Sequence, residues 1–292
     1  MIASLKNTRQ YRWLTESKIL RYYWLAVILA SAIIATAAEL WVTRAGPGAS
    51  GDSVHYIQGA LNLLAGHGFS RLKASGQYIP ITSFPPGLSF VLAGLHALGL
   101  AVIDAGRYLN TILLGINTVL VGLLLHRATR SGLLAIVGSW MFMYAENIVR
   151  IHSWIMTEPL FLFFVFSAIL LLDLYFQRGK IILLVVACLS VGFAALTRYV
   201  GLALIPATCL AILIVHKEKA SRRWRDAILA GLVCLLPIVL WFWHNAQSTG
   251  NPVNRQLIYH PISKNLIFAF FDEISYYWFA PSLTIPYRIR WS

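Results

Sequence analysis

The sequence predicts an all-α polytopic membrane protein with about seven transmembrane helices and juxtamembrane helices in a long first exterior loop. Of its 292 residues, 58% are hydrophobic and only 12% are charged, and the mean hydropathy is +0.68. Soluble globular domains carry about 25% charged residues, so this composition argues strongly against a soluble enzyme. Apolar runs long enough to cross about 30 Å of hydrocarbon recur along the chain and identify the individual helices.

The excess of basic residues is first of all a signal of membrane topology. Lys and Arg number 24 against 11 Asp and Glu, a formal charge of +13. In a soluble chain this excess would suggest nucleic acid, but cytoplasmic loops of membrane proteins accumulate Lys and Arg, so we expect no nucleic-acid partner. The cysteines lie inside apolar runs without metal-ligand spacing and are interpreted as small hydrophobic residues. They are Cys188, Cys209 and Cys234.

Seven apolar runs are candidate transmembrane spans, if tilt and short helices are allowed. They cover residues 20–42, 107–126, 132–149, 158–176, 181–197, 200–215 and 226–244. An eighth run, 86–103, is ambiguous by length, and the charges decide its placement. If it spans and the N-terminus is cytoplasmic, the most basic loop, 216–226, faces the exterior, against the positive-inside rule. If it lies in the interface, 14 of the 24 basic residues are cytoplasmic. We therefore expect seven spans, with the N-terminus inside and the C-terminus outside.

This topology divides the chain into three parts. Residues 1–19 form a basic cytoplasmic N-terminus, residues 20–244 a transmembrane module with the exterior loop 43–106, and residues 245–292 an exterior tail. In the tail, the run 266–280 contains two adjacent acids, which favours a helix on the membrane surface over an eighth span.

The first exterior loop predicts two helices. An amphipathic helix is expected from Ser53 to Leu64, with Asp52 at its N-cap position and a stop at Gly66. The pair Pro85-Pro86 then opens the apolar helix in 86–103, because proline is tolerated in a first helical turn.

The acidic residues are few enough to be considered one by one. Asp52 is either a helix N-cap or a general base at the membrane surface, and the two roles are compatible. Glu158 follows Thr157 and precedes Pro159, which fits an acid at a helix N-terminus as well as a site residue. Asp226 lies in a cytoplasmic basic segment, where solvated pairing with its neighbours explains it.

The candidate phosphate ligands are arginines at the expected exterior face. Arg198, between two spans, is either a snorkelling anchor or a phosphate clamp. Arg255 is either an ordinary exterior charge or a phosphate ligand, and Arg150 is a further candidate. His55 and His152 fit interfacial hydrogen-bonding residues better than metal ligands, since no zinc-type spacing is present.

Taken together, these segments resemble the membrane-embedded glycosyltransferases of the GT-C superfamily. The likeness is to the bacterial relatives of protein O-mannosyltransferases and to the lipid A aminoarabinose transferase. The matching segments are Gly51-Asp52-Ser53-Val54-His55-Tyr56 with its continuation to Phe69, Phe84-Pro85-Pro86-Gly87, Thr157-Glu158-Pro159-Leu160, Leu196-Thr197-Arg198 and Gly250-Asn251-Pro252. Their order and spacing carry the resemblance.

The resemblance implies a polyprenyl-phosphate sugar donor, and a glycan, lipid or protein as acceptor. It makes Asp52 the candidate catalytic base and Arg150, Arg198 and Arg255 the candidates that hold the donor phosphate. Ser53 stands where protein mannosyltransferases often carry a second acid. Some relatives use a divalent cation, but no clear ligand set for one is present here. Family members are usually longer, which suggests a truncated chain.

The expected activity is hexosyl or pentosyl transfer at the exterior face of the cell membrane by a single inverting displacement. Asp52 would accept the acceptor proton, with His55 or Tyr56 orienting the acceptor, while arginines stabilise the departing phosphate. Two other functions remain open: a transporter or flippase for lipid-linked sugars, and a non-catalytic, truncated membrane paralogue.

Overall fold

The computed structural model describes residues 18–216, 218–252 and 261–278, which form helices, their connecting loops and one small hairpin. The long helices are α2 (Lys18–Val42), α5 (Val102–Thr129), α8 (Glu158–Arg178) and α11 (Ala220–Thr249). The shorter elements are η2 (Thr43–Ala45), α3 (Gly51–Leu64), α4 (Gly87–Ala97), α6 (Gly132–Tyr144), α7 (Glu146–Ser153), α9 (Ile181–Thr197), η3 (Tyr199–Ala203), α10 (Leu204–Val215) and α12 (Lys264–Trp278). The hairpin pairs β1 (Ser70–Leu72) with β2 (Tyr78–Pro80) in antiparallel fashion. The expected all-α membrane fold is confirmed.

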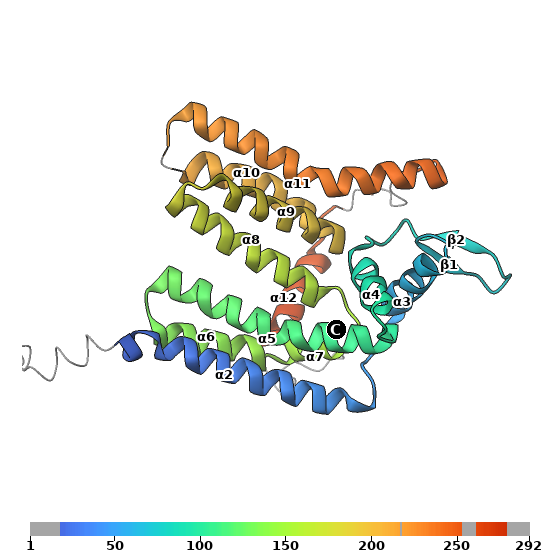
Figure 1. The fold of residues 1–292 in the computed structure, drawn as a ribbon, viewed down its shortest axis with the longest axis horizontal. Coiled ribbons are helices and arrows are strands. Elements are labelled where there is room, and N and C mark those ends of the chain that lie inside the picture. Colours follow the sequence, from blue (N-terminus) through green and yellow to red (C-terminus); the bar gives the residue numbers. More distant parts are fainter. Residues whose placement is uncertain (1–17, 217, 253–260, 279–292) are drawn as a thin grey trace, which may run out of the picture. The chain divides into compact units, whose positions relative to one another are not determined.

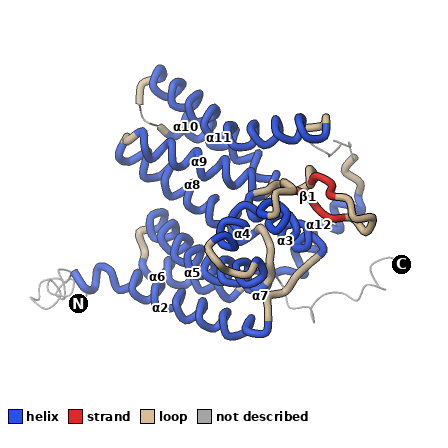
Figure 2. Tube along the Cα trace, turned by 45° about the vertical axis from the view of Figure 1, so that its right-hand side comes forward, coloured by secondary structure: helices blue, strands red, loops and turns tan. Residues whose placement is uncertain are grey.

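The chain up to Asn254 forms one compact unit, and α12 belongs to a second unit that begins at Arg255. Within the first unit, α2, α5 and α6 pack together, and α8, α9, α10 and α11 form a second group that joins the first where α8 packs on α5 (Figure 1). The helices α5 and α8 run in one direction, and α2 and α11 run in the other (Figure 1). We call the end where α2 finishes and α5 and α8 begin the α3 end, because it carries α3, α4 and the hairpin (Figure 2). The turns α5–α6, α8–α9 and α10–α11 lie at the opposite end.

The helices follow the apolar runs of the sequence. Four of them, α2, α5, α8 and α11, are long and apolar enough to cross a membrane, and the pair α6 and α7 would make a fifth span. The expected span 132–149 falls on this pair, whose two helices meet at 56° at Ala145, where the backbone is extended. The helices α9 and α10 occupy the expected runs but are shorter, so the count of seven spans stays a prediction.

The ambiguous run 86–103 forms the short helix α4 and the start of α5. The 11 residues of α4 reach about 16 Å at 1.5 Å per residue, too little to cross the hydrocarbon core. The chain turns back at Gly99, whose φ of +101° is a left-handed conformation that glycine adopts without strain. The helix α4 is therefore placed against α3 and α5 at the α3 end.

Small residues and exposed apolar side chains fit a bundle that lies in lipid. A Cβ on Gly115 would lie 2.5 Å from the Thr36 hydroxyl, and a Cβ on Gly192 would lie 2.8 Å from the Pro237 ring, so helices approach closely at these glycines. The outer faces carry large apolar side chains such as Ile214, which is 76% exposed. A protein in water rarely exposes such contiguous apolar surface, whereas lipid tails cover it.

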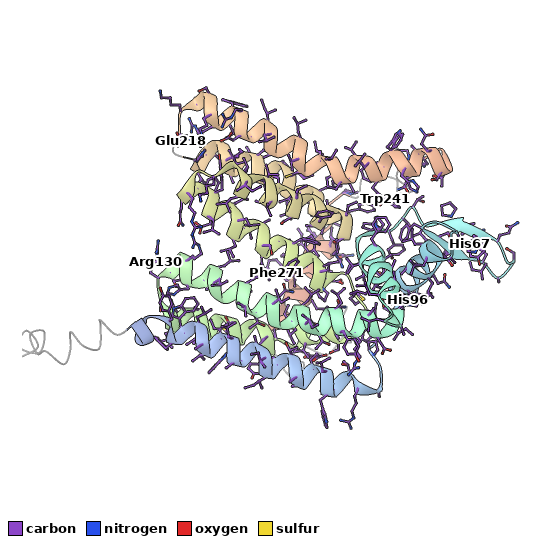
Figure 3. All side chains as sticks on the ribbon, viewed as in Figure 1. His67, His96, Arg130, Glu218, Trp241 and Phe271 are labelled. Carbon is purple, nitrogen blue, oxygen red and sulfur yellow. The ribbon has the colours of Figure 1, made fainter. Side chains whose placement is uncertain are left out.

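Ion pairs around a buried carboxylate lie at the opposite end of the bundle, where Figure 3 shows Arg130 and Glu218, away from Trp241, His96 and His67 at the α3 end. Asp226 is completely buried, which corrects the expectation that it is solvated. Its carboxylate accepts hydrogen bonds from Nε and Nη2 of Arg225, at 2.9 and 2.8 Å, and from the hydroxyl of Tyr175. The pairing was expected, but the helices α8 and α10 cover the charge, which the sequence does not reveal.

Candidate functional site

The helix α3 begins at a capping box that leaves Asp52 outside the cap. Ser50, not Asp52, is the N-cap: its backbone N–H donates to Oγ of Ser53 at 2.9 Å, and its hydroxyl accepts from the Ser53 N–H at 3.4 Å. The helix therefore starts at Gly51, two residues before the expected start. Asp52 stands in the first turn with an exposed side chain. No hydrogen bond or ion pair within the described part of the chain uses its carboxylate.

The start of α3 is fixed to the segment that leads into α8. The Ser53 hydroxyl donates to the carbonyl of Ile155 at 2.7 Å, across 102 residues of sequence. Two backbone hydrogen bonds of Gly48 add to this link. The Gly48 N–H donates to the Ser153 carbonyl at 3.0 Å, and the Gly48 carbonyl accepts from the Ile155 N–H at 2.9 Å. These contacts place Asp52 near the start of α8, where Glu158 lies.

Glu158, Thr157 and Arg198 form one polar cluster. The Arg198 guanidinium pairs with the Glu158 carboxylate through Nη1, and the same nitrogen donates to the Thr157 hydroxyl at 3.1 Å. The Tyr56 phenol interacts with the Thr157 hydroxyl as well, and this interaction acts to lower the pKa of Tyr56. The structure thus brings together Tyr56, Glu158 and Arg198, three residues that the sequence nominated separately.

The segment around Pro85-Pro86 packs on the elements that carry this cluster. A Cβ on Gly87 would lie 2.7 Å from the Leu196 carbonyl oxygen, so the start of α4 rests directly on the end of α9. The ring of Phe84 stacks on His55 with centroids 4.7 Å apart and meets Tyr56 edge-on at 5.6 Å. The four segments 51–56, 84–87, 155–158 and 196–198 therefore meet at the α3 end.

The surroundings set the protonation of the two aromatic residues on α3. Burial raises the pKa of Tyr56 to about 12, although the hydrogen bond with Thr157 and the charge of Arg198 act against it. Burial and the charge of Arg71 lower the pKa of His55, while Asp52 opposes them. At neutral pH Tyr56 is a hydrogen-bonding phenol and His55 is mostly neutral, so neither side chain supplies a charge.

Arg71 is a site residue that the sequence did not suggest. It lies on β1, in a hairpin that packs on α3 and turns at Gly76, whose φ is +80°. The side chain is exposed and lies close enough to His55 to lower its pKa. The strands have only three residues each, too few for an alternating pattern, and the turn at Gly76 is the sole signal in the sequence.

An apolar cavity of about 320 Å³ adjoins the cluster at the α3 end. Aromatic rings form much of its wall, with Trp241 edge-on to Phe69 at 5.4 Å and to Phe90 at 6.5 Å. Leu196 lines it two residues before Arg198, and Pro237 lines it from inside α11, where a proline interrupts the helical hydrogen bonds. The cavity and the polar cluster therefore share the end of α9.

One predicted phosphate ligand, Arg150, is not brought to the cluster. Arg150 lies exposed on α7, and its Nη2 donates to the Asn147 side chain at 2.9 Å on the same helix. Arg255 lies outside the described residues. His152 is buried, with Nδ1 2.6 Å from the Ile148 carbonyl oxygen, so it is a hydrogen-bonding residue as expected, but in the interior. Among the residues described, no three His, Cys, Asp or Glu side chains are placed to hold a metal ion.

The chain matches a known family of glycosyltransferases. The family model described as dolichyl-phosphate-mannose-protein mannosyltransferase matches residues 93–258, more than half of the chain. The match contains Glu158 and Arg198, whereas Asp52 precedes it. Neither the curated proteins nor the solved structures gave a match.

Proposed function

Because the chain belongs to the dolichyl-phosphate-mannose-protein mannosyltransferase family, we propose that it transfers a sugar from a polyprenyl-phosphate donor with Asp52 as the general base. The family supports glycosyl transfer from such a donor. The single observation that carries the proposed site is the meeting of four distant segments at the α3 end, around Tyr56, Thr157 and Arg198. The acceptor would be a glycan, a lipid or a protein.

The proposed reaction is one inverting displacement. An acceptor oxygen or nitrogen attacks the anomeric carbon from the face opposite the phosphate. The bond from that carbon to the phosphate oxygen breaks, and its electron pair leaves with the phosphate. The acceptor proton passes to the carboxylate of Asp52. A lipid phosphate is a good leaving group, so one carboxylate suffices where glycoside hydrolases need two.

Arg198 is the proposed ligand of the donor phosphate. Both contacts that the structure describes for its guanidinium use Nη1, which leaves Nε and Nη2 for phosphate oxygens. Arginine suits this role because its planar fork binds two oxygens at once. A guanidinium that is already fixed stabilises the charge that grows on the departing phosphate without having to reorganise. Arg255 is proposed as a further phosphate ligand.

The apolar cavity is proposed to hold the first isoprene units of the donor lipid. Its aromatic and aliphatic walls accept a branched hydrocarbon chain and offer it few polar partners. Because Leu196 lines the cavity close to Arg198 in sequence, a phosphate on Arg198 would bring the chain to the entrance. The proposed orientation, in which the α3 end faces the exterior of the cell membrane and the N-terminus is cytoplasmic, rests on the distribution of basic residues.

Replacing Asp52 by Asn tests the base. Membranes that contain the protein would be supplied with polyprenyl-phosphate [³H]mannose, and the transfer of label from the lipid to endogenous acceptors would be measured. We expect Asp52→Asn to reduce the initial rate by about 10²- to 10⁴-fold. Asp104→Asn is the matched control, because Asp104 is also exposed in the first turn of a helix at the α3 end, and it should leave the rate unchanged. A rate near the wild-type value for Asp52→Asn would refute the assignment.

A further inference from the structure

Thr157 occupies the N-cap of α8 but does not use its hydroxyl as a cap. Threonine at an N-cap normally accepts a hydrogen bond from a backbone N–H of the first turn. Here the backbone of Thr157 is in the right-handed helical region, and no such bond forms. The residue is nevertheless only 1% exposed. Its buried hydroxyl must therefore be satisfied elsewhere, since an unpaired buried hydroxyl is costly.

The partners of this hydroxyl come from three separate segments. It accepts from Nη1 of Arg198 at 3.1 Å and donates to Oε2 of Glu158 at 3.4 Å. The Tyr56 phenol on α3 is its third polar neighbour, and this interaction acts to lower the pKa of Tyr56. Thr157 therefore interacts both with Tyr56 on α3 and with Arg198, the residue after α9.

We propose that Thr157 is a positioning residue for the transfer reaction, which holds Arg198 and Tyr56 in one fixed relation. Tyr56 follows Asp52 by four residues on α3, so the two side chains lie on the same helix face. The Thr157 hydroxyl thus links the helix that carries the base to the guanidinium that meets the phosphate. The inference rests on the proposed function, because it assigns roles to the same two groups.

Removing the Thr157 hydroxyl affects Arg198 and Tyr56 differently. Arg198 keeps Glu158 as a partner, so its guanidinium stays in place but loses the second contact that fixes its rotation. Tyr56 is buried and has no other hydrogen-bond partner for its hydroxyl among the contacts that the structure describes. The change therefore affects the geometry of the phosphate ligand and of the α3 face together, with little effect on the number of charges in the site.

The test compares Thr157→Val, which keeps the shape and removes the hydroxyl, with Thr157→Ser, which keeps the hydroxyl. We expect Thr157→Val to lower kcat for polyprenyl-phosphate mannose by about 10- to 100-fold and to raise the donor KM, because a hydrogen bond to a charged group is lost. Thr157→Ser should stay within about threefold of the wild type on the same grounds. Thr118→Val is the matched control. It removes another fully buried threonine hydroxyl, one that bonds only the Leu114 carbonyl of its own helix, and should lower the melting temperature without changing kcat or KM.

A second variant covers the case in which Thr157→Val does not fold. Tyr56→Phe removes the same link from its other side and should lower kcat as well. Where Thr157→Val does fold, a double-mutant cycle of the two changes should show losses that are far from additive. Equal kinetics for the Val and Ser variants, with an active wild type, would overturn the positioning role alone. An inactive wild type, or an active Asp52→Asn variant, would instead overturn the proposed function.

Discussion

The carboxylate of Asp52 stands in the first turn of a helix whose N-terminus is already capped by Ser50 and Ser53. A negative charge in a first turn interacts favourably with the helix dipole, worth about 0.3–1 kcal/mol at an exposed position. Loss of that interaction is too small to unfold α3. Asp52→Asn therefore tests chemistry rather than folding, which would not hold if Asp52 were the cap.

The lowered pKa of His55 predicts an acid-sensitive contribution to stability. The folded protein disfavours the imidazolium because the ring is partly buried against Phe84 and faces Arg71, with Asp52 acting in the opposite direction. The unfolded chain therefore binds more protons than the folded chain once the pH falls below about 6.5, the ordinary value for histidine. The contribution of His55 is complete above that pH and is lost as the pH falls towards the lowered value.

His55→Phe checks this sign, because it keeps an aromatic ring for the stack on Phe84 and removes the titration. Melting temperatures in detergent would be measured at pH 8 and at pH 5. We expect the wild type to lose more on acidification than the variant does. An equal or larger loss in the variant would show that His55 is not disfavoured as a cation.

The sequence predicts individual site residues, but it does not predict which of them contact one another. Asp52, Glu158 and Arg198 can be chosen because charged groups are rare and costly near apolar spans. Thr157 and Arg71 could not be chosen as site residues. The contact of Thr157 with Arg198 joins positions 41 residues apart, and Arg71 reaches the site only because a hairpin folds onto α3.

At the level of the elements, the contact between α4 and α9 is where one added methyl group is expected to destabilise the fold. A Cβ on Gly87 would lie 2.7 Å from the backbone oxygen of Leu196 and 3.0 Å from the Thr197 hydroxyl, and a backbone atom cannot move aside cheaply. We expect Gly87→Ala to cost about 1–3 kcal/mol, as overpacking usually does, and to reduce transfer because the 84–87 and 196–198 segments separate.

Gly94→Ala is the matched control on the same helix. A Cβ there meets nothing within 4 Å, and alanine is the better helix former by up to about 1 kcal/mol. Thermal unfolding of both variants is the measurement. The prediction requires the two substitutions to shift the melting temperature in opposite directions, so a loss of the same size in both would contradict it.

Elements with a strong local signal were predicted well, and those fixed by tertiary contacts were not. The stop of the first exterior helix at Leu64 and the start of α4 after Pro85-Pro86 follow from glycine and proline chemistry. The bend at Ala145 could not be predicted, because no proline or glycine stands beside it in the sequence. The hairpin 70–80 is too short for a strand pattern, and packing on α3 supplies the stability that two short strands lack.

In the molecule as a whole, the two ends of the bundle carry different kinds of side-chain interactions. The α3 end holds the polar cluster and the apolar cavity, and the opposite end holds ion pairs that join helices, such as Arg127 with Asp173. Composition alone predicts the membrane class, because no other arrangement covers so much apolar surface. The number of spans is not predictable in the same way, since α9 and α10 are short enough that only the position of the bilayer decides whether they cross it.

Labelling of introduced cysteines tests the proposed orientation. In a background with the three native cysteines replaced by alanine, Lys73→Cys places a thiol on the exposed hairpin, and Lys180→Cys places one at the exposed turn between α8 and α9. With a membrane-impermeant maleimide applied to intact cells, we expect the first variant to be labelled and the second to react only after permeabilisation. The reverse pattern would place the α3 end, and with it the reaction, in the cytoplasm.

The buried carboxylate of Asp226 also constrains the order in which the bundle is assembled during synthesis. Its hydroxyl donor, Tyr175, belongs to α8, whereas Arg225 is its neighbour on α11. A charge that enters the membrane without its partners is costly, and breaking a buried pair typically costs about 3–5 kcal/mol. Because the ribosome makes α8 before α11, the phenol is already present when the carboxylate arrives. The last long helix, α11, can therefore pack against its partner on α8 as soon as it leaves the translocation channel.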